Sequence, residues 1–150
     1  MSTRAGIIAG IVLFFVIIAL GWVLVVTPAP AEPAPPAPPV VEPFVSEMVQ
    51  ITSPLSGASV PKTFTVKGEA RGTWYFEASF PIKVNDAGGT MVGSGIAQAQ
   101  GEWMTTEFVP FSAPVVVTNY SGPATLVLLK DNPSGLPEYD DAVSIPIVIQ

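Results

Sequence analysis

Apolar and polar residues alternate along short stretches of the chain from about residue 48 onward, a pattern typical of β-strands with one buried face. The clearest stretch is residues 76–85, FEASFPIKVN. Its even-numbered residues are apolar, and its odd-numbered residues are polar or proline. The sequence DAGG, residues 86–89, follows it and is typical of a hairpin turn. We therefore expect a strand whose buried face is formed by Phe76, Ala78, Phe80, Ile82 and Val84.

Two further stretches alternate in the same way. Residues 63–70 place Phe64 and Val66 on one face, and residues 141–150 place four aliphatic residues on one face, Val143, Ile145, Ile147 and Ile149. Pro146 lies on the opposite face of the last stretch and predicts an edge strand, because proline cannot donate a ladder hydrogen bond.

The remaining strands are predicted from apolar content. Residues 124–130 are apolar on both faces, as in a central strand, and weaker strands are expected near residues 48–53, 90–99 and 103–112. Seven short strands separated by turn residues favour an all-β fold, an immunoglobulin-like two-sheet β-sandwich. We assign this domain to residues 48–150, which is long enough to form a core without metal or disulfide support.

The first part of the chain is different, because residues 5–26 contain no charged side chain. At 1.5 Å per residue a helix of this length spans about 33 Å, the thickness of a bilayer core. We therefore expect residues 1–27 to be a single-pass transmembrane anchor that contacts the lipid bilayer through residues 5–26. Arg4 predicts a cytoplasmic N-terminus and an extracytoplasmic C-terminal domain. A signal peptide cleaved after Ala29–Pro30–Ala31 is the alternative.

Residues 28–47 predict an extended linker, because eight prolines occur between Pro28 and Pro43. A polyproline segment rises about 3.1 Å per residue, so this linker would hold the domain roughly 50 Å from the membrane.

Composition and charge exclude several classes of partner and of chemistry. The net charge is −6 and the basic residues are scattered, which argues against nucleic acid and anionic lipid surfaces as partners. The chain has no cysteine and no histidine, so it lacks thiolate ligands, the commonest general base and the commonest metal ligand. We therefore expect no catalysis, no cofactor and no metal.

Three strings carry a family resemblance: VKGEARGTWYFEASFPI, GEWMTTEFVPFSA and LLKDNPSGLPEYDDAVSIPI. Together they resemble the immunoglobulin-like domain of bacterial spore germination, over roughly residues 51–148. The resemblance implies an immunoglobulin-like sandwich and a role in the bacterial cell envelope, with no known catalysis. The family's domain often lies beside a germination-and-sporulation module, whereas this sequence has an apolar segment and a proline-rich one.

Residues 68–82, GEARGTWYFEASFPI, place three charged residues beside three aromatic ones. We expect Arg71 to pair with Glu69 or Glu77 across a corner between two strands, with Gly72 allowing the bend. Trp74 and Phe76 would close the core beneath this pair. The alternatives are a glycan-binding surface that uses Trp74, Tyr75 or Trp103 as a stacking platform, and a pair of catalytic carboxylates.

Two other groups of residues are candidate sites. The loop KDNPSGLPEYDD contains five oxygen-bearing side chains that could bind calcium, Asp131, Asn132, Glu138, Asp140 and Asp141. Its spacing matches no EF-hand, and Asp131, Pro133 and Gly135 suit an ordinary ordered turn. Trp103 is expected to cover the core or an edge of the sheet rather than to form a platform.

The sequence therefore predicts a membrane-tethered, extracytoplasmic interaction module that contacts an envelope protein or cell-wall polymer. A carbohydrate-binding module for cell-wall glycan is the alternative, and exposed aromatic side chains would favour it. A hydrolase is a third class, which the absence of histidine and cysteine disfavours.

Overall fold

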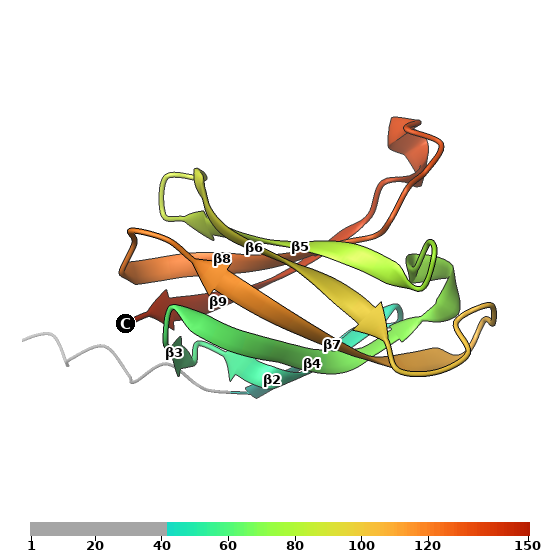
Figure 1. Ribbon diagram of the computed structural model, residues 1–150, viewed down its shortest axis with the longest axis horizontal. Coiled ribbons are helices and arrows are strands. Elements are labelled where there is room, and N and C mark those ends of the chain that lie inside the picture. Colours follow the sequence, from blue (N-terminus) through green and yellow to red (C-terminus); the bar gives the residue numbers. More distant parts are fainter. Residues whose placement is uncertain (1–41) are drawn as a thin grey trace, which may run out of the picture. The chain divides into compact units, whose positions relative to one another are not determined.

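The computed structural model describes residues 42–150, which form an all-β domain of nine strands with two short 3-10 turns (Figure 1). The strands are β1 (Glu42–Val45), β2 (Val49–Ser56), β3 (Ser59–Val60), β4 (Thr63–Arg71), β5 (Ser79–Asp86), β6 (Met91–Ala99), β7 (Phe108–Val117), β8 (Gly122–Leu129) and β9 (Ala142–Ile149). The 3-10 turns are η1 (Gly72–Trp74) and η2 (Pro137–Tyr139).

The predicted arrangement of two separate sheets is corrected by the strand pairing. The nine strands form one hydrogen-bonded sheet in the order β1-β2-β4-β7-β6-β5-β8-β9-β3. The sheet curls, so that β2 contacts β9 and Gly57 donates a hydrogen bond to the Pro146 carbonyl at 2.8 Å. The two halves of the curled sheet face each other as the layers of a sandwich would, but they are joined through β6 (Figure 1).

Strand β6 joins the halves because it pairs with β5 on one side and β7 on the other. Glycine makes this double pairing possible: a Cβ atom on Gly95 would lie 2.4 Å from the Pro114 carbonyl oxygen of β7. Its neighbour Gly93 would similarly meet the Val116 carbonyl oxygen at 2.7 Å. The backbones can approach closely at this point only because no side chain separates them.

The alternation pattern locates most strands correctly. In β9 the predicted face, from Ile145 to Ile149, is buried, and Pro146 lies outside it. The predicted edge strand is wrong, because β9 pairs with β8 on one side and with the two residues of β3 on the other, so that β3 is the edge strand. Strand β8 is central, between β5 and β9, as predicted.

The core is formed by the inward faces of these strands. Its largest fully buried side chains are Trp74, Phe80, Ile51, Ile82, Leu126, Leu128, Ile145, Ile147 and Ile149. Among residues 42–150 no charged residue is buried, and the polar side-chain atoms in the core are the Tyr75 hydroxyl and the Trp74 Nε1, which has no hydrogen-bond partner.

Some boundaries differ from the prediction. The strand expected over residues 103–112 begins at Phe108, because residues 103–107 form a loop. Residues 42–45, which fall in the predicted linker, form β1 and pair antiparallel with β2. The half-buried Phe44 side chain packs against the core, which explains why this short strand joins the sheet.

The described part of the chain contains no helix long and apolar enough to span a bilayer. The predicted anchor and most of the predicted linker lie outside the described residues.

Strand β1 gives a first test. We expect a fragment of residues 38–150 to be more stable than one of residues 48–150 by about 1 kcal/mol, since a half-buried Phe44 gives part of the about 1.5–3 kcal/mol of a fully buried one. Urea unfolding of both fragments would measure this difference. Phe44→Ala in the longer fragment should reproduce most of the loss, and the exposed Val45→Ala should not. Equal stability of the two fragments would contradict the role assigned to β1.

Candidate functional site

The corner between β4 and β5 is built around two buried aromatic side chains. Trp74, at the end of η1, is fully buried, and Tyr75 is 4% exposed. The Tyr75 hydroxyl donates to the Val109 carbonyl at 2.7 Å. Burial raises the pKa of Tyr75 well above its ordinary value, and the negative charge of Glu69 raises this pKa further. The prediction that Trp74 closes the core is confirmed.

Phe76 and Glu77 do not continue the strand as predicted. Phe76 and Ser79 exchange two backbone hydrogen bonds of 3.0 Å, which leaves Glu77 and Ala78 at the tip of a tight turn. Both tip residues have left-handed backbones, with φ of 48° and 61°. This turn breaks the alternation, so Phe76 is 41% exposed and the placement of Phe76 in the core was wrong.

Arg71 braces this corner with other partners than predicted. Its Nε donates to the Glu47 carbonyl at 3.2 Å and its Nη1 to the Thr106 carbonyl at 3.3 Å. Its guanidinium carbon lies 4.0 Å from the centre of the Phe108 ring. The carboxylate nearest to it is that of Glu107, at 3.8 Å, so the expected ion pair with Glu69 or Glu77 is wrong.

The backbone explains this change of partners. Arg71 is opposite Phe108 in the β4–β7 register, which brings the loop that ends at Glu107 next to the guanidinium. Gly72 is needed here, because a Cβ on it would lie 2.0 Å from the Thr105 carbonyl oxygen. Gly72 was predicted to allow a bend, but its φ is not positive, and the structure requires glycine here for the close approach of the two backbones.

The glycan-stacking alternative required exposed aromatic side chains at Trp74, Tyr75 or Trp103. The first two are buried, and Trp103 is half-buried against the core. Next to Trp103, Met104 is 74% exposed and borders a shallow hollow of about 380 Å³. A pair of exposed stacking rings at this corner is therefore not formed.

The loop between β8 and β9 is held by the Asn132 side chain. Asn132 Nδ2 donates to the Leu136 carbonyl at 2.9 Å and to Asp140 Oδ1 at 2.7 Å, and the Ser134 hydroxyl donates to Asn132 Oδ1 at 2.6 Å. Pro133 is exposed between them, and Gly135 has φ of 65°, as a turn position of this kind favours. The predicted ordered turn is therefore present.

Metal binding by this loop finds no geometric support. Among residues 42–150, no three acidic side chains lie together as a group that could hold a cation. Asp140 is engaged by Asn132, and Asp141 Oδ1 accepts from the Ala142 amide at 2.8 Å.

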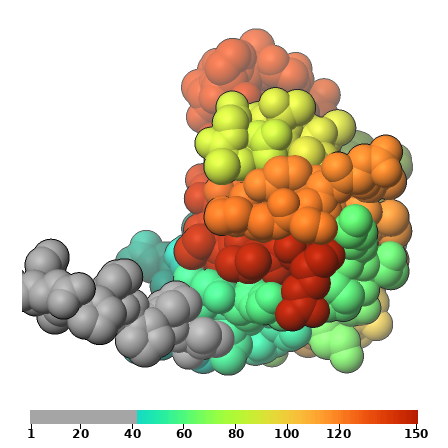
Figure 2. All heavy atoms as spheres, turned by 90° about the vertical axis from the view of Figure 1, so that its left-hand side faces the viewer, coloured from blue at the N-terminus to red at the C-terminus, as the bar shows by residue number. Residues whose placement is uncertain are grey.

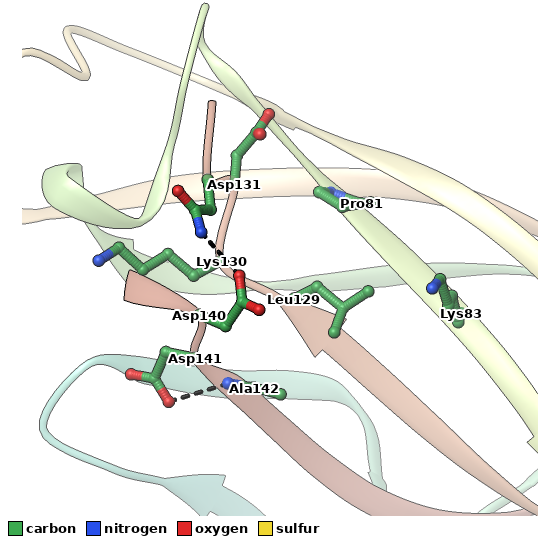
Figure 3. Close-up of a pocket in the computed structure, with 9 residues that line it drawn as sticks. Pro81, Lys83, Leu129, Lys130, Asp131, Asp140, Asp141 and Ala142 are labelled. Atoms are coloured by element: carbon green, nitrogen blue, oxygen red, sulfur yellow. Dashed lines mark hydrogen bonds between the residues drawn. The ribbon is translucent and has the colours of Figure 1, made fainter. Parts of the chain in front are cut away.

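The same loop forms one wall of a groove of about 560 Å³, shown in Figure 3, which we call the sheet–loop groove. Its floor is apolar and consists of outward side chains of the sheet, Pro81 from β5, Leu129 from β8 and Ala142 from β9. These residues meet because Ile82 pairs with Leu128 and Leu129 with Ala142, so that their outer neighbours lie side by side.

Charged residues surround this floor. Asp131, Asp140 and Asp141 line one side of the groove at separate points, with Lys83 on β5 across from them, whereas the Lys130 side chain extends away (Figure 3). The ion pair between Arg71 and Glu107 is the only one among the described residues, so these carboxylates and Lys83 have no ionic partner there.

Sequence reasoning singled out Asp131 but missed the groove. Pro81, Lys83 and Leu129 are outward positions of two strands that are far apart in the sequence, and only the β5–β8 register brings them together. The outward apolar residues Pro81 and Leu129 were the available signal, since such positions on a solvated face are otherwise polar.

A comparison with family models agrees with the sequence resemblance. The model described as the immunoglobulin-like domain of bacterial spore germination matches residues 48–135, more than half of the chain. The match ends at Gly135, so β9 lies beyond it. Comparisons with curated proteins and with solved structures gave no match.

The contacts of Arg71 predict a specific pattern of stability losses in the 38–150 fragment. Arg71→Ala should cost about 1–2 kcal/mol, because it removes two hydrogen bonds and the contact with Phe108. Glu107→Ala should cost less than about 1 kcal/mol, since its side chain is 80% exposed. Glu69→Ala and Glu77→Ala, which remove no contact with Arg71, serve as controls, and urea unfolding would measure all four. A loss in either control as large as that of Arg71→Ala would contradict this account.

Proposed function

Because the chain belongs to the family of immunoglobulin-like domains of bacterial spore germination, we propose that it is a non-catalytic interaction module of the cell envelope. The module is tethered to the membrane by residues 1–27 and displayed outside by the proline-rich segment. Its partner is an envelope protein or a cell-wall polymer. Tethering raises the effective concentration of the module near that partner, so weak contacts suffice.

The observation that carries this proposal is the distribution of polar groups. All charged side chains of residues 42–150 lie outside the core, on the outer face of the sheet and in its loops. A catalytic site commonly holds ionisable groups in a buried position, where their pKa values are shifted toward the task. The buried ionisable group among residues 42–150 is Tyr75, whose raised pKa and hydrogen bond to the Val109 carbonyl keep its hydroxyl neutral inside the core. A surface that only binds a partner has no such requirement.

The sequence supports the tether independently. The apolar segment is long enough to cross a bilayer, Arg4 is the basic residue that precedes it, and no basic cluster follows it. The proline-rich segment then has the composition of a spacer rather than of a core.

Cysteine labelling tests this topology cleanly, because the natural chain has no cysteine. Met104 is 74% exposed, so we expect Met104→Cys to react with a membrane-impermeant maleimide on intact cells. Ser2→Cys should react only after permeabilisation and should remain in the membrane-bound protein.

The opposite labelling pattern, or a mature protein without residue 2, would contradict the tethered arrangement. The interaction itself is tested by capturing envelope components on the immobilised 38–150 fragment. Loss of capture in an unfolded control would be expected.

A further inference from the structure

The sheet–loop groove is large enough to hold a small ligand. Its volume of about 560 Å³ is within the range of about 300–1,000 Å³ typical of small-ligand sites. In Figures 1 and 2 the loop between β8 and β9 projects beyond the sheet, and Figure 3 shows the residues of this loop and of the sheet that line the groove. The hydrogen bonds of Asn132 to Leu136 and Asp140 fix the internal shape of the loop, and the Asp131 amide anchors its start by donating to the Trp74 carbonyl at 3.0 Å.

The charges around the groove indicate which charged groups a ligand of the groove would have. The Asp131 side chain accepts no hydrogen bond from the described residues and forms no ion pair with them. Lys83, on β5 across the floor, is exposed and likewise lacks an ionic partner among residues 42–150. A ligand with an ammonium group at one end and a carboxylate at the other would satisfy both sides at once.

The floor limits the ligand further. Pro81, Leu129 and Ala142 offer small apolar contacts and no aromatic ring, so the floor does not suit the stacking of a sugar. Small aliphatic side chains fit this floor better. The combination of an ammonium, a carboxylate and small aliphatic groups within a few residues is the chemistry of a short peptide.

We propose that the sheet–loop groove binds the stem peptide of the cell wall, with its free ammonium group at Asp131 and its terminal carboxylate at Lys83. This inference rests on the proposed function, because it names the wall polymer as partner and its peptide, rather than its glycan, as the part recognised. Asp140 and Asp141 add negative charge on the ammonium side of the groove.

The experiment uses the full-length protein in detergent and a synthetic pentapeptide, N-acetyl-L-Ala-γ-D-Glu-L-Lys-D-Ala-D-Ala with the α-carboxyl group of D-Glu amidated. The lysine ammonium and the terminal carboxylate are then its only charged groups, and binding is followed by calorimetry. Saturable binding is expected. Acetylation of the lysine and amidation of the C-terminus should each weaken binding about tenfold, as expected for the loss of one hydrogen bond between charged groups.

Two variants connect each end of the peptide to its residue. Asp131→Asn should weaken binding of the unmodified peptide about tenfold and should not weaken binding of the acetylated peptide further. Lys83→Met should behave in the same way toward the amidated peptide. The matched controls are Glu102→Gln and Lys67→Met, exposed residues outside the groove, which should bind as the natural chain does.

Absence of peptide binding, or equal binding by Asp131→Asn and the natural chain, would overturn the inference. The proposed function would still stand if Met104→Cys is labelled outside and envelope components are captured. Labelling of the domain in the cytoplasm would overturn the proposed function itself, whatever the peptide does.

Discussion

The domain depends on an aromatic cluster centred on Phe80. The Phe80 ring makes edge-to-face contacts with Tyr75 at 5.1 Å, Phe111 at 5.0 Å and Trp74 at 6.4 Å between ring centres. These four rings come from the corner after β4, from β5 and from β7, so they connect the two halves of the curled sheet. Edge-to-face pairs contribute beyond the apolar area that they bury. The aromatic residues of the corner are therefore part of the interior. Beside them, at the surface, Arg71 stabilises the corner through its hydrogen bonds.

This arrangement separates the scaffold from the surface available for binding. The corner uses its aromatic rings inside and its Arg71 contacts at the rim, so neither remains for a ligand. The sheet–loop groove lies on the outer face of β5, β8 and β9, where the same strands present Pro81, Leu129 and Ala142 outward. One set of strands thus supplies the core with one face and a candidate ligand site with the other. The division is the ordinary consequence of the two-residue period of a strand.

The sequence was sufficient for the all-β class and for most strands, because alternation reports directly which face is buried. It was insufficient where the pairing of distant strands decides which residues come into contact. Glu107 and Arg71 are far apart in the chain, and the β4–β7 register brings them together. Phe76 was misplaced because Glu77 and Ala78 adopt left-handed backbones that these residue types seldom favour. The single curled sheet also depends on long-range pairing through β6, which alternation within each strand does not specify.

The central claim is that the aromatic corner is interior scaffold, and a matched pair of phenylalanine substitutions tests it most directly. Phe80 is fully buried in the cluster, whereas Phe76, four positions earlier, is 41% exposed. In urea unfolding of the 38–150 fragment, Phe80→Ala should lower the free energy of unfolding by about 3–5 kcal/mol, the usual cost of removing a buried ring. Phe76→Ala should lower it by less than about 1 kcal/mol, since little of its apolar area is lost from the interior. Similar small losses for both variants would contradict the claim.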